Sequence, residues 1–497
     1  MATTTAEGVE RVHYGGNRFL NFIGGRWVEA RGGARVPDVN PARTDEVLGY
    51  AESSAPEDVR AAIDAAAAAF RAWRATSAPQ RGEIVRKAAD LMEQRKEDIA
   101  KVLTLEEGKV LAESRAELDR GIANMRFAAG QGLRLTGETI PSNQPNTFIY
   151  TTREPLGVVA AVTPWNFPVA IPAWKIAPAL VSGNTVVFKP ASLTPWCAAL
   201  VVQCFVDAGV PEGVLNLVLG QGEVLSAALL DDDRVKAISF TGSSAVGRRL
   251  YARAAQRLCK VQLEMGGKNA VIVLEDADLE KASESVAVGA FGATGQRCTA
   301  TSRAVVVKPL VKDFTAALEA KARAWPAGDG LREGVRMGPI VDETQLRKVR
   351  TKIEEGKREG ARLVLDGSEP KLPELRRGYF VEPTIFADVD PRMTIAREEI
   401  FGPVISVIPA DDLESALAAA NAAGYGLSSS IYTRDLRAAF RYAAESEAGM
   451  LHVNIPTLGG EAQVPFGGVK DSGFGDRECG TAAFDFFTEM RVVYVGY

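Results

Sequence analysis

Residues 155–188 read PLGVVAAVTPWNFPVAIPAWKIAPALVSGNTVVF and contain a single charge, Lys175. The stretch is long enough to cross a membrane, but prolines interrupt it at Pro155, Pro164, Pro168, Pro172 and Pro178. We therefore interpret it as a buried strand (GVVAAVT), a tight polar loop (PWNFP), a helix (VAIPAWKIAPALVSG) and a second buried strand (TVVFKPA). Runs of Val, Leu and Ile with few charges are typical of parallel strands that are covered on both faces.

The sequence on both sides of this stretch continues the alternation of strand and helix. The expected elements are short strands within 19–31 and 44–52, helices from Pro56 and over 81–103 and 108–130, and buried strands at 214–220 and 235–243. This alternation predicts a doubly wound α/β sheet.

A second α/β unit is expected after Gly267, beginning with the strand NAVIVLED. Its further elements are strands at 304–308 and 404–408, a helix from Val311, the helix DLESALAAANAA and the strand SSSIYT. The tail, FFTEMRVVYVGY, is apolar and aromatic, which predicts a strand. An apolar strand at a chain end needs a partner, which a second subunit could provide.

Composition excludes several classes of protein. The chain has 497 residues, of which 46% are apolar and 24% charged, and its net charge is -5. These values predict two or three globular domains and no nucleic-acid partner. The N-terminal residues lack the apolar core of a signal peptide, so we expect a cytoplasmic protein with no membrane contact.

The counts of cysteine and histidine exclude further chemistry. Five cysteines without CxxC spacing indicate a reducing compartment and no structural zinc. The two histidines, His13 and His452, are too few for a histidine-rich metal site. Neither lies near a candidate nucleophile in sequence, which argues against a Ser-His-Asp or Cys-His hydrolase.

The stretch 263–299, LEMGGKNAVIVLEDADLEKASESVAVGAFGATGQRCT, contains the candidate catalytic groups. Glu264 stands near its start and Cys298 near its end, after an expected helix. A reactive cysteine needs a polar, electropositive setting, and the neighbouring Arg297 is one source of positive charge. A lone cysteine is more often a small buried apolar residue, and a lone carboxylate before Gly-Gly can be a surface acid.

Seven motifs together identify a resemblance. They are TPWNFP (163–168), GNTVVFKPAS (183–192), FTGS (240–243), LEMGGK (263–268), GQRC (295–298), EEIFGPV (398–404) and PFGGVKDSG (465–473). In this order the chain resembles the NAD(P)-dependent aldehyde dehydrogenases from about residue 20 to its end. The resemblance implies a Rossmann-type cofactor domain (1–136 and 153–263), an α/β catalytic domain (264–465) and a small β oligomerisation ribbon (137–152 and 478–497), in a dimer or tetramer.

The resemblance also implies a mechanism. Cys298 would attack the aldehyde, while the Asn166 amide and the Cys298 backbone N–H stabilise the oxyanion. After hydride transfer to the nicotinamide, Glu264 would activate water against the thioester. Because CoA-acylating members lack this carboxylate, its presence favours hydrolysis to a free acid. The alternatives are a cofactor-independent cysteine hydrolase and a structural protein that has lost activity. Retention of Cys298, Glu264 and Asn166 argues against the structural protein.

Lys175 is expected to pair with an acid, since it stands alone in an uncharged run. The resemblance suggests Glu478, either as a structural ion pair or as part of a proton relay. In the family a Gly-Arg-Glu sequence usually stands here, but in this chain Asp476 separates the glycine from Arg477 and Glu478. The sequence therefore departs from the family pattern on which the Lys175–Glu478 pairing rests.

The cofactor residues follow from the same motifs. The backbone around Gly242 and Ser243 would meet the pyrophosphate, Glu399 and Lys189 the two riboses, and Phe401 the nicotinamide. The full set expected to bind the cofactor is Thr163, Pro164, Trp165, Lys189, Ala191, Ser192, Gly222, Phe240, Thr241, Gly242, Ser243, Val246, Met265, Gly266, Glu399 and Phe401. Ser192 replaces an acid that would repel a 2′-phosphate, so we predict that NADP is preferred and that NAD is also accepted.

The substrate residues form the last group. Phe167, Ile171, Trp174 and Phe466 are expected to line an apolar tunnel. The polar groups expected near the tunnel are Gln131, Arg134, Arg297 and Thr299. The guanidinium of Arg134 or Arg297 would hold the far carboxylate of an ω-oxo acid. Alternatively, Arg297 only tunes the pKa of the thiol. The motif combination most resembles 2-oxoglutarate semialdehyde (2,5-dioxopentanoate) dehydrogenases, with succinate semialdehyde or a broad range of aliphatic aldehydes as the alternative.

Overall fold

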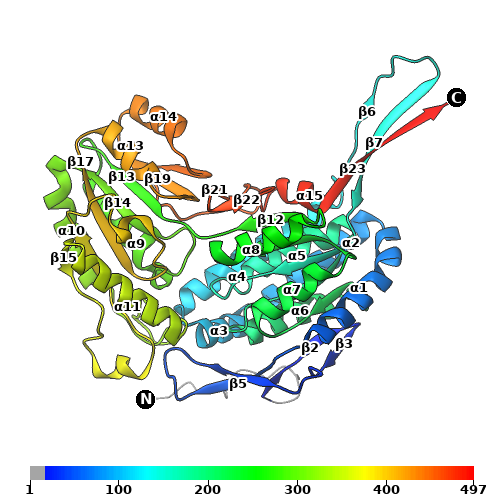
Figure 1. Ribbon diagram of the computed structural model, residues 1–497, viewed down its shortest axis with the longest axis horizontal. Coiled ribbons are helices and arrows are strands. Elements are labelled where there is room, and N and C mark those ends of the chain that lie inside the picture. The colour runs from blue at the N-terminus through cyan, green and yellow to red at the C-terminus, as the bar shows by residue number, and fades with distance from the viewer. Residues whose placement is uncertain (1–16) are drawn as a thin grey trace.

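The computed structural model describes residues 17–497. Residues 1–16, which include His13 and the start of the expected cofactor domain, lie outside the described residues. Figure 1 shows two α/β lobes and a narrow arm that projects from one of them and ends at the C-terminus. Within residues 17–497, no helix combines the length and the apolar character that a membrane span requires.

The first lobe is built on an eight-stranded sheet. Its strands, in spatial order, are β22 (Gly473–Phe474), β12 (Lys260–Glu264), β11 (Val235–Thr241), β8 (Val158–Val162), β9 (Thr185–Lys189), β10 (Leu215–Leu217), β2 (Asn21–Ile23) and β3 (Arg26–Val28). The five strands from β12 to β10 are parallel to one another. The outer strands β22, β2 and β3 each pair antiparallel with the preceding strand toward the centre of the sheet. Every residue of β8 and β9 is buried, which confirms the expected doubly wound sheet.

Helices cover both faces of this sheet (Figure 1). They are α1 (Pro56–Ala75), α2 (Ala78–Gln94), α3 (Lys96–Glu107), α4 (Leu111–Gln131), α5 (Ala170–Ser182), α6 (Pro195–Asp207), α7 (Gly222–Asp231) and α8 (Ser244–Ala255). The stretch 81–103, expected as one helix, is divided between α2 and α3, because the backbone of Arg95 leaves the helical conformation. Helix α3 ends at Gly108, whose φ of 100° favours glycine.

The second lobe contains a seven-stranded sheet. Its strands, in spatial order, are β15 (Arg362–Leu365), β16 (Thr384–Ala387), β17 (Val404–Ala410), β14 (Thr301–Val307), β13 (Asn269–Val273), β19 (Ser428–Tyr432) and β20 (Met450–Val453). Only β15 runs antiparallel to its neighbour. The helices are α9 (Leu279–Phe291), α10 (Val311–Arg323), α11 (Glu343–Arg358), α12 (Thr394–Arg397), α13 (Leu413–Asn421) and α14 (Leu436–Glu445), with 3-10 turns η2 (Gly292–Gly295), η3 (Lys308–Leu310) and η4 (Pro373–Arg377).

Smaller sheets complete the fold. One contains β1 (Arg18–Phe19), β5 (Val47–Glu52) and β4 (Arg35–Val39), and another pairs β18 (Tyr425–Gly426) with β21 (Val469–Lys470). The arm contains β6 (Thr139–Ile140), β7 (Thr147–Pro155) and β23 (Thr488–Gly496), preceded by α15 (Ala482–Phe487). The expected tail strand therefore starts two residues late, because Phe486 and Phe487 are buried in the core at the end of α15.

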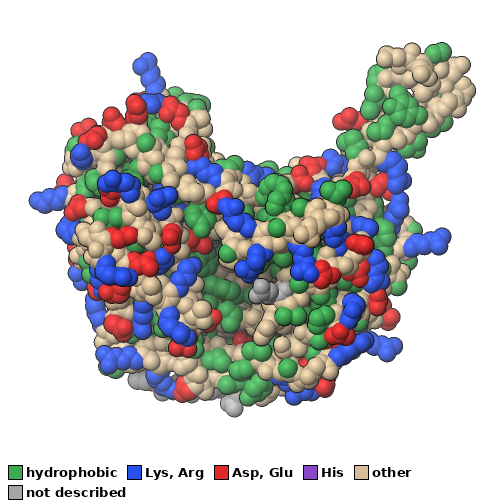
Figure 2. Space-filling model, in the orientation of Figure 1, with side chains coloured by type: hydrophobic (Ala, Val, Ile, Leu, Met, Phe, Trp, Pro, Cys, Tyr) green, Lys and Arg blue, Asp and Glu red, His purple; other side chains and the backbone are tan. Residues whose placement is uncertain are grey.

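The arm exposes apolar side chains that the body of the molecule does not cover. Figure 2 shows few charges near its tip and several hydrophobic side chains along it. The exposed large apolar residues of the arm are Ile140, Phe148, Met490, Val492, Tyr494, Val495 and Tyr497. Strand β23 pairs with β7 along its whole length, from Thr488 opposite Pro155 to Gly496 opposite Thr147.

Candidate active site

A cavity of about 380 Å³ lies where the two lobes meet. It is lined by all of the residues predicted to bind the cofactor, together with Asn166, Ile171 and Cys298. Many of these residues follow the carboxyl ends of β8, β9 and β11, which is where ligands bind in open α/β sheets. Sequence reasoning missed several other lining residues, namely Val162, Leu193, Ser226, Arg249, Gln345 and Lys348. They lie outside the seven motifs: Val162 ends β8, Leu193 lies in a loop, and the other four are on α7, α8 and α11.

The first-lobe side of the cavity suits an anionic nucleotide. Lys189 is buried, and its ammonium has no carboxylate partner within the described residues; burial lowers its pKa to about 8. Ser243 precedes α8, so the unpaired N–H groups of the first turn face this end of the cavity. A Cβ on Gly222 would stand 3.2 Å from Lys189 Nζ, and one on Gly266 would stand 2.5 Å from the Glu399 carboxylate. Small residues therefore keep the cavity open.

The loop that carries Cys298 has an unusual backbone. Ala293, Thr294 and Gly295 follow α9 with φ values of 46°, 57° and 66°, all in the left-handed region. Gly295 is required because a Cβ there would stand 2.2 Å from the Gly402 carbonyl oxygen. The turn brings the chain back so that the Asn269 side-chain amide donates a hydrogen bond of 2.8 Å to the Cys298 carbonyl.

Burial controls the ionisation of the Cys298 thiol. Burial, with a smaller contribution from the Glu264 carboxylate, raises its pKa to about 12, and the guanidinium of Arg120 opposes the shift. Glu264 is buried as well, and burial together with the nearby Glu478 raises its pKa well above the usual range. Burial thus disfavours the charged forms of both the thiol and the carboxyl.

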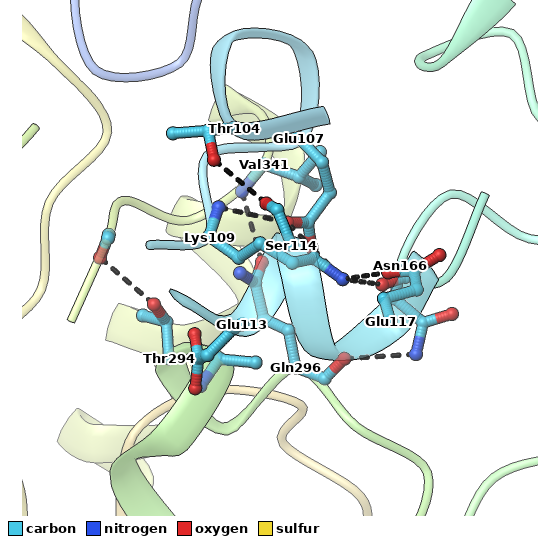
Figure 3. A network of polar contacts seen from close by, with 12 residues as sticks. Thr104, Glu107, Lys109, Glu113, Ser114, Glu117, Asn166, Thr294, Gln296 and Val341 are labelled. Carbon is cyan, nitrogen blue, oxygen red and sulfur yellow. Dashed lines mark hydrogen bonds and ion pairs between the residues drawn. The ribbon is translucent and has the colours of Figure 1, made fainter. Parts of the chain in front are cut away.

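A buried polar network holds Asn166 against the Cys298 loop (Figure 3). The Asn166 side-chain amide donates to the Gln296 carbonyl at 3.0 Å. Behind it, Lys109 Nζ donates to the Asn166 carbonyl and to Glu117 Oε2, each at 2.6 Å. The other Glu117 oxygen accepts the N–H groups of Val169 and Ala170 at the start of α5. One ion pair therefore fixes the Asn166 carbonyl and the backbone that follows it at the start of α5.

The same network accounts for Arg297. Its guanidinium pairs with Glu113 at 2.9 Å, and Glu113 also accepts the Ala293 N–H at 2.7 Å. The charge of Arg297 is therefore balanced by an acid from α4, and its supply of positive charge to the thiol stays a prediction. The cation that lowers the pKa of Cys298 is Arg120, which sequence reasoning missed.

Lys175 and Glu478 form a buried ion pair despite the extra residue Asp476. Lys175 also donates to Ser239 Oγ at 2.7 Å, and Trp174 Nε1 donates to the second Glu478 oxygen at 2.8 Å. Asp476 is accommodated at the surface, where its carboxylate lies 3.5 Å from Lys260 Nζ.

The predicted tunnel residues divide into two groups. Phe167, Ile171, Trp174 and Phe466 form one apolar cluster with Cys298. The polar residues proposed at its mouth, Gln131, Arg134, Arg297 and Thr299, do not line the cavity. Arg134 is exposed beyond the end of α4 and donates to the Gly130 carbonyl, so its side chain turns back on its own helix.

The fold and site define a two-lobed α/β enzyme in which a cysteine and an asparagine border a nucleotide-sized cavity. The chain belongs to the aldehyde dehydrogenase family, which it matches over residues 27–493. It is 48% identical over 479 residues to the alpha-ketoglutaric semialdehyde dehydrogenase of Bacillus subtilis, covering 96% of this chain and 98% of the relative. It is 44% identical to the 2,5-dioxopentanoate dehydrogenase of Saccharolobus solfataricus, covering 95% and 98%. The betaine aldehyde dehydrogenase of Staphylococcus aureus, solved with NAD+, superposes with a TM-score of 0.94 at 33% identity, covering 96% and 95%.

Proposed function

We propose that this enzyme oxidises 2-oxoglutarate semialdehyde (2,5-dioxopentanoate) to 2-oxoglutarate, with hydrolysis of an enzyme-bound thioester. The reaction type is supported by Cys298 and Asn166, which line one cavity, and by the Glu264 carboxylate, which lies within electrostatic range of the thiol. The choice of substrate is supported by the names of two relatives that match almost the whole chain.

The first step is addition of the thiol to the aldehyde. Sulfur of Cys298 bonds to the carbonyl carbon, and the thiol proton is released to solvent. The carbonyl oxygen becomes an alkoxide, which the Asn166 amide and the Cys298 backbone N–H stabilise by hydrogen bonds. One Asn166 N–H is occupied by the Gln296 carbonyl, which leaves its second N–H for the alkoxide.

The second step removes the hydride. A nicotinamide cofactor, when bound, supplies the acceptor for the hydride that leaves this carbon, and a thioester remains on Cys298. Glu399 and Lys189 would hold the ribose groups, and the start of α8 would hold the pyrophosphate. Phe401 packs edge-to-face on Trp165, with ring centroids 5.5 Å apart, and this pair would border the nicotinamide.

The third step is hydrolysis. Glu264 takes a proton from water, the water oxygen attacks the thioester carbon, and the carbon–sulfur bond breaks to release the acid. The proton on Glu264 then passes to the Cys298 thiolate, which restores both groups. The balance is aldehyde, water and oxidised cofactor to acid, reduced cofactor and a proton. The Lys175–Glu478 pair tunes this base, because Glu478 raises the pKa of Glu264 and Lys175 lowers it.

We infer further that NADP is the preferred cofactor. Ser192 lines the cavity three residues after Lys189, where an acid would repel a 2′-phosphate. Arg249 and Lys348 also line the cavity and add positive charge. We also propose a cytoplasmic homodimer or homotetramer joined through segments 137–152 and 478–497, with residues 1–136 and 153–263 as the cofactor domain and 264–465 as the catalytic domain.

The test is a comparison of substrates with purified enzyme. Reduced-cofactor absorbance is followed with 2,5-dioxopentanoate, succinate semialdehyde, glutaraldehyde and hexanal, each at varied concentration. We expect the highest kcat/KM for 2,5-dioxopentanoate and release of free 2-oxoglutarate without CoA. A higher kcat/KM for succinate semialdehyde or hexanal would replace the proposed substrate with the alternative one.

A further inference from the structure

Arg120 lies beside the aromatic wall of the apolar cluster that contains Cys298. It projects from the middle of α4, and its guanidinium carbon is 4.8 Å from the Trp174 ring centroid and 5.5 Å from that of Phe466. Both rings belong to the cluster with Ile171 and Cys298. The effect of Arg120 on the pKa of Cys298 places its charge within electrostatic range of the sulfur.

The guanidinium of Arg120 has no acidic partner within residues 17–497. Its Nε is buried and makes no hydrogen bond there. Other arginines of the same helix behave differently, because Arg115 pairs with Glu97 and Arg126 pairs with Glu93. A partly buried cation without a counter-ion is costly, since its N–H groups lose water without gaining acceptors. Stacking on two aromatic rings offsets only part of this cost.

The loop that covers Arg120 is shaped around it. Gly460 has a φ of 148°, and a Cβ at this position would stand 2.1 Å from Arg120 Nη2. Only glycine leaves room for the guanidinium there. The loop and the aromatic pair therefore hold the side chain from two sides, which limits its freedom before any ligand binds.

We propose that Arg120 is the specificity-determining residue of this enzyme and that it binds the far carboxylate of an ω-oxo acid. The inference rests on the proposed function and names the group that selects its substrate. In 2,5-dioxopentanoate, four carbon–carbon bonds separate the aldehyde carbon from the carboxylate, so Cys298 and Arg120 would hold opposite ends of one short molecule. A planar guanidinium can receive a carboxylate by two parallel hydrogen bonds. The same charge would repel an aldehyde that carries a quaternary ammonium group.

The experiment compares carboxylated and neutral aldehydes in three variants. Arg120→Met removes the charge, Arg120→Lys retains it without the two-pronged geometry, and Arg126→Met is a control on another face of α4. We expect Arg120→Met to lower kcat/KM for 2,5-dioxopentanoate and succinate semialdehyde by about 10- to 100-fold, mostly through KM. The loss on pentanal should be far smaller, because only the effect of the Arg120 charge on the thiol applies to a neutral aldehyde. On the carboxylated aldehydes, Arg120→Lys should lie between Arg120→Met and the unmodified enzyme. Arg126→Met should match the unmodified enzyme.

The outcomes separate this inference from the proposed function. A parallel loss on pentanal and on the carboxylated aldehydes in both Arg120 variants would show a structural role and overturn the proposal. An unmodified enzyme without preference for carboxylated over neutral aldehydes would overturn it too. If the unmodified enzyme prefers another ω-oxo acid and Arg120→Met loses that preference, the result contradicts 2,5-dioxopentanoate as the substrate. It still supports Arg120 as the residue that binds the far carboxylate.

Discussion

The ammonium of Lys109 lies 2.6 Å from the backbone carbonyl oxygen of Asn166, deep in the interior behind the cavity. Lys109 is surrounded by the acids Glu107 and Glu117, whose charges outweigh the effect of burial and raise its pKa. The position of Asn166 therefore depends on an ion pair between two residues that do not line the cavity.

Lys109→Met should destabilise the enzyme, because it leaves a buried carboxylate without its cation. We expect the free energy of unfolding to fall by about 3–5 kcal/mol, measured by chemical unfolding. The control is Lys96→Met on the adjacent helix, whose pair with Asp119 is partly exposed and should contribute less than about 1 kcal/mol. Equal losses in the two variants would contradict a special role for the buried pair.

The catalytic assignments predict different kinetics for two variants. Cys298→Ala should have no detectable oxidation, because no thioester can form. Glu264→Gln should release about one equivalent of reduced cofactor per active site and then turn over slowly, since deacylation lacks its base. Stopped-flow absorbance distinguishes them, and circular dichroism checks that both variants are folded. Full steady-state activity in Cys298→Ala would exclude it as the nucleophile.

The reactivity of the thiol should depend on pH in a defined direction. Because burial and the Glu264 charge raise the Cys298 pKa to about 12, thiolate is scarce near neutrality and its fraction grows as the pH rises. Alkylation of the cofactor-free enzyme by iodoacetamide should accelerate about tenfold per unit between pH 7 and pH 10. Glu264→Gln removes a negative charge, which lowers the thiol pKa and should speed alkylation. Slower alkylation in that variant would show that Glu264 acts on the thiol chiefly as a proton acceptor.

Much of the fold and of the cavity lining could be predicted from sequence, for a physical reason. The resemblance implied cofactor residues in TPWNFP, KPAS and FTGS, and these residues do line one cavity. They lie together because residues that follow apolar parallel strands meet at one sheet edge. Arg120 could not be found in this way, because it stands in an ordinary helix among other arginines and differs only in lacking a partner. Arg297 was predicted to act at the site because it precedes Cys298 in the sequence. Its ion-pair partner, Glu113, is 184 residues away and could not be recognised from sequence.

The arm should mediate assembly through its exposed apolar side chains. The exposed fractions of Tyr494 and Met490 are 69% and 66%, so the arm presents large apolar side chains to solvent. We expect a dimer or tetramer by light scattering at micromolar concentration. Tyr494→Asp should shift it toward smaller species, because a charge would be buried at the interface. Leu436→Asp, at an equally exposed apolar site on α14, should leave the assembly unchanged. A monomeric unmodified enzyme would contradict the prediction.

Cofactor preference should be set by charge at position 192. Ser192 and Lys189 both line the cavity at the end of β9, and the Lys189 ammonium has no acidic partner within the described residues. Ser192→Glu would supply a carboxylate that accepts a hydrogen bond from a ribose hydroxyl and repels a 2′-phosphate. We expect the ratio of kcat/KM for NAD over NADP to rise by about 100-fold in this variant. Ser192→Gln has the same bulk without the charge, so it should change the ratio far less. If the unmodified enzyme already favours NAD strongly, or if Gln and Glu act alike, charge at this position does not determine the choice of cofactor.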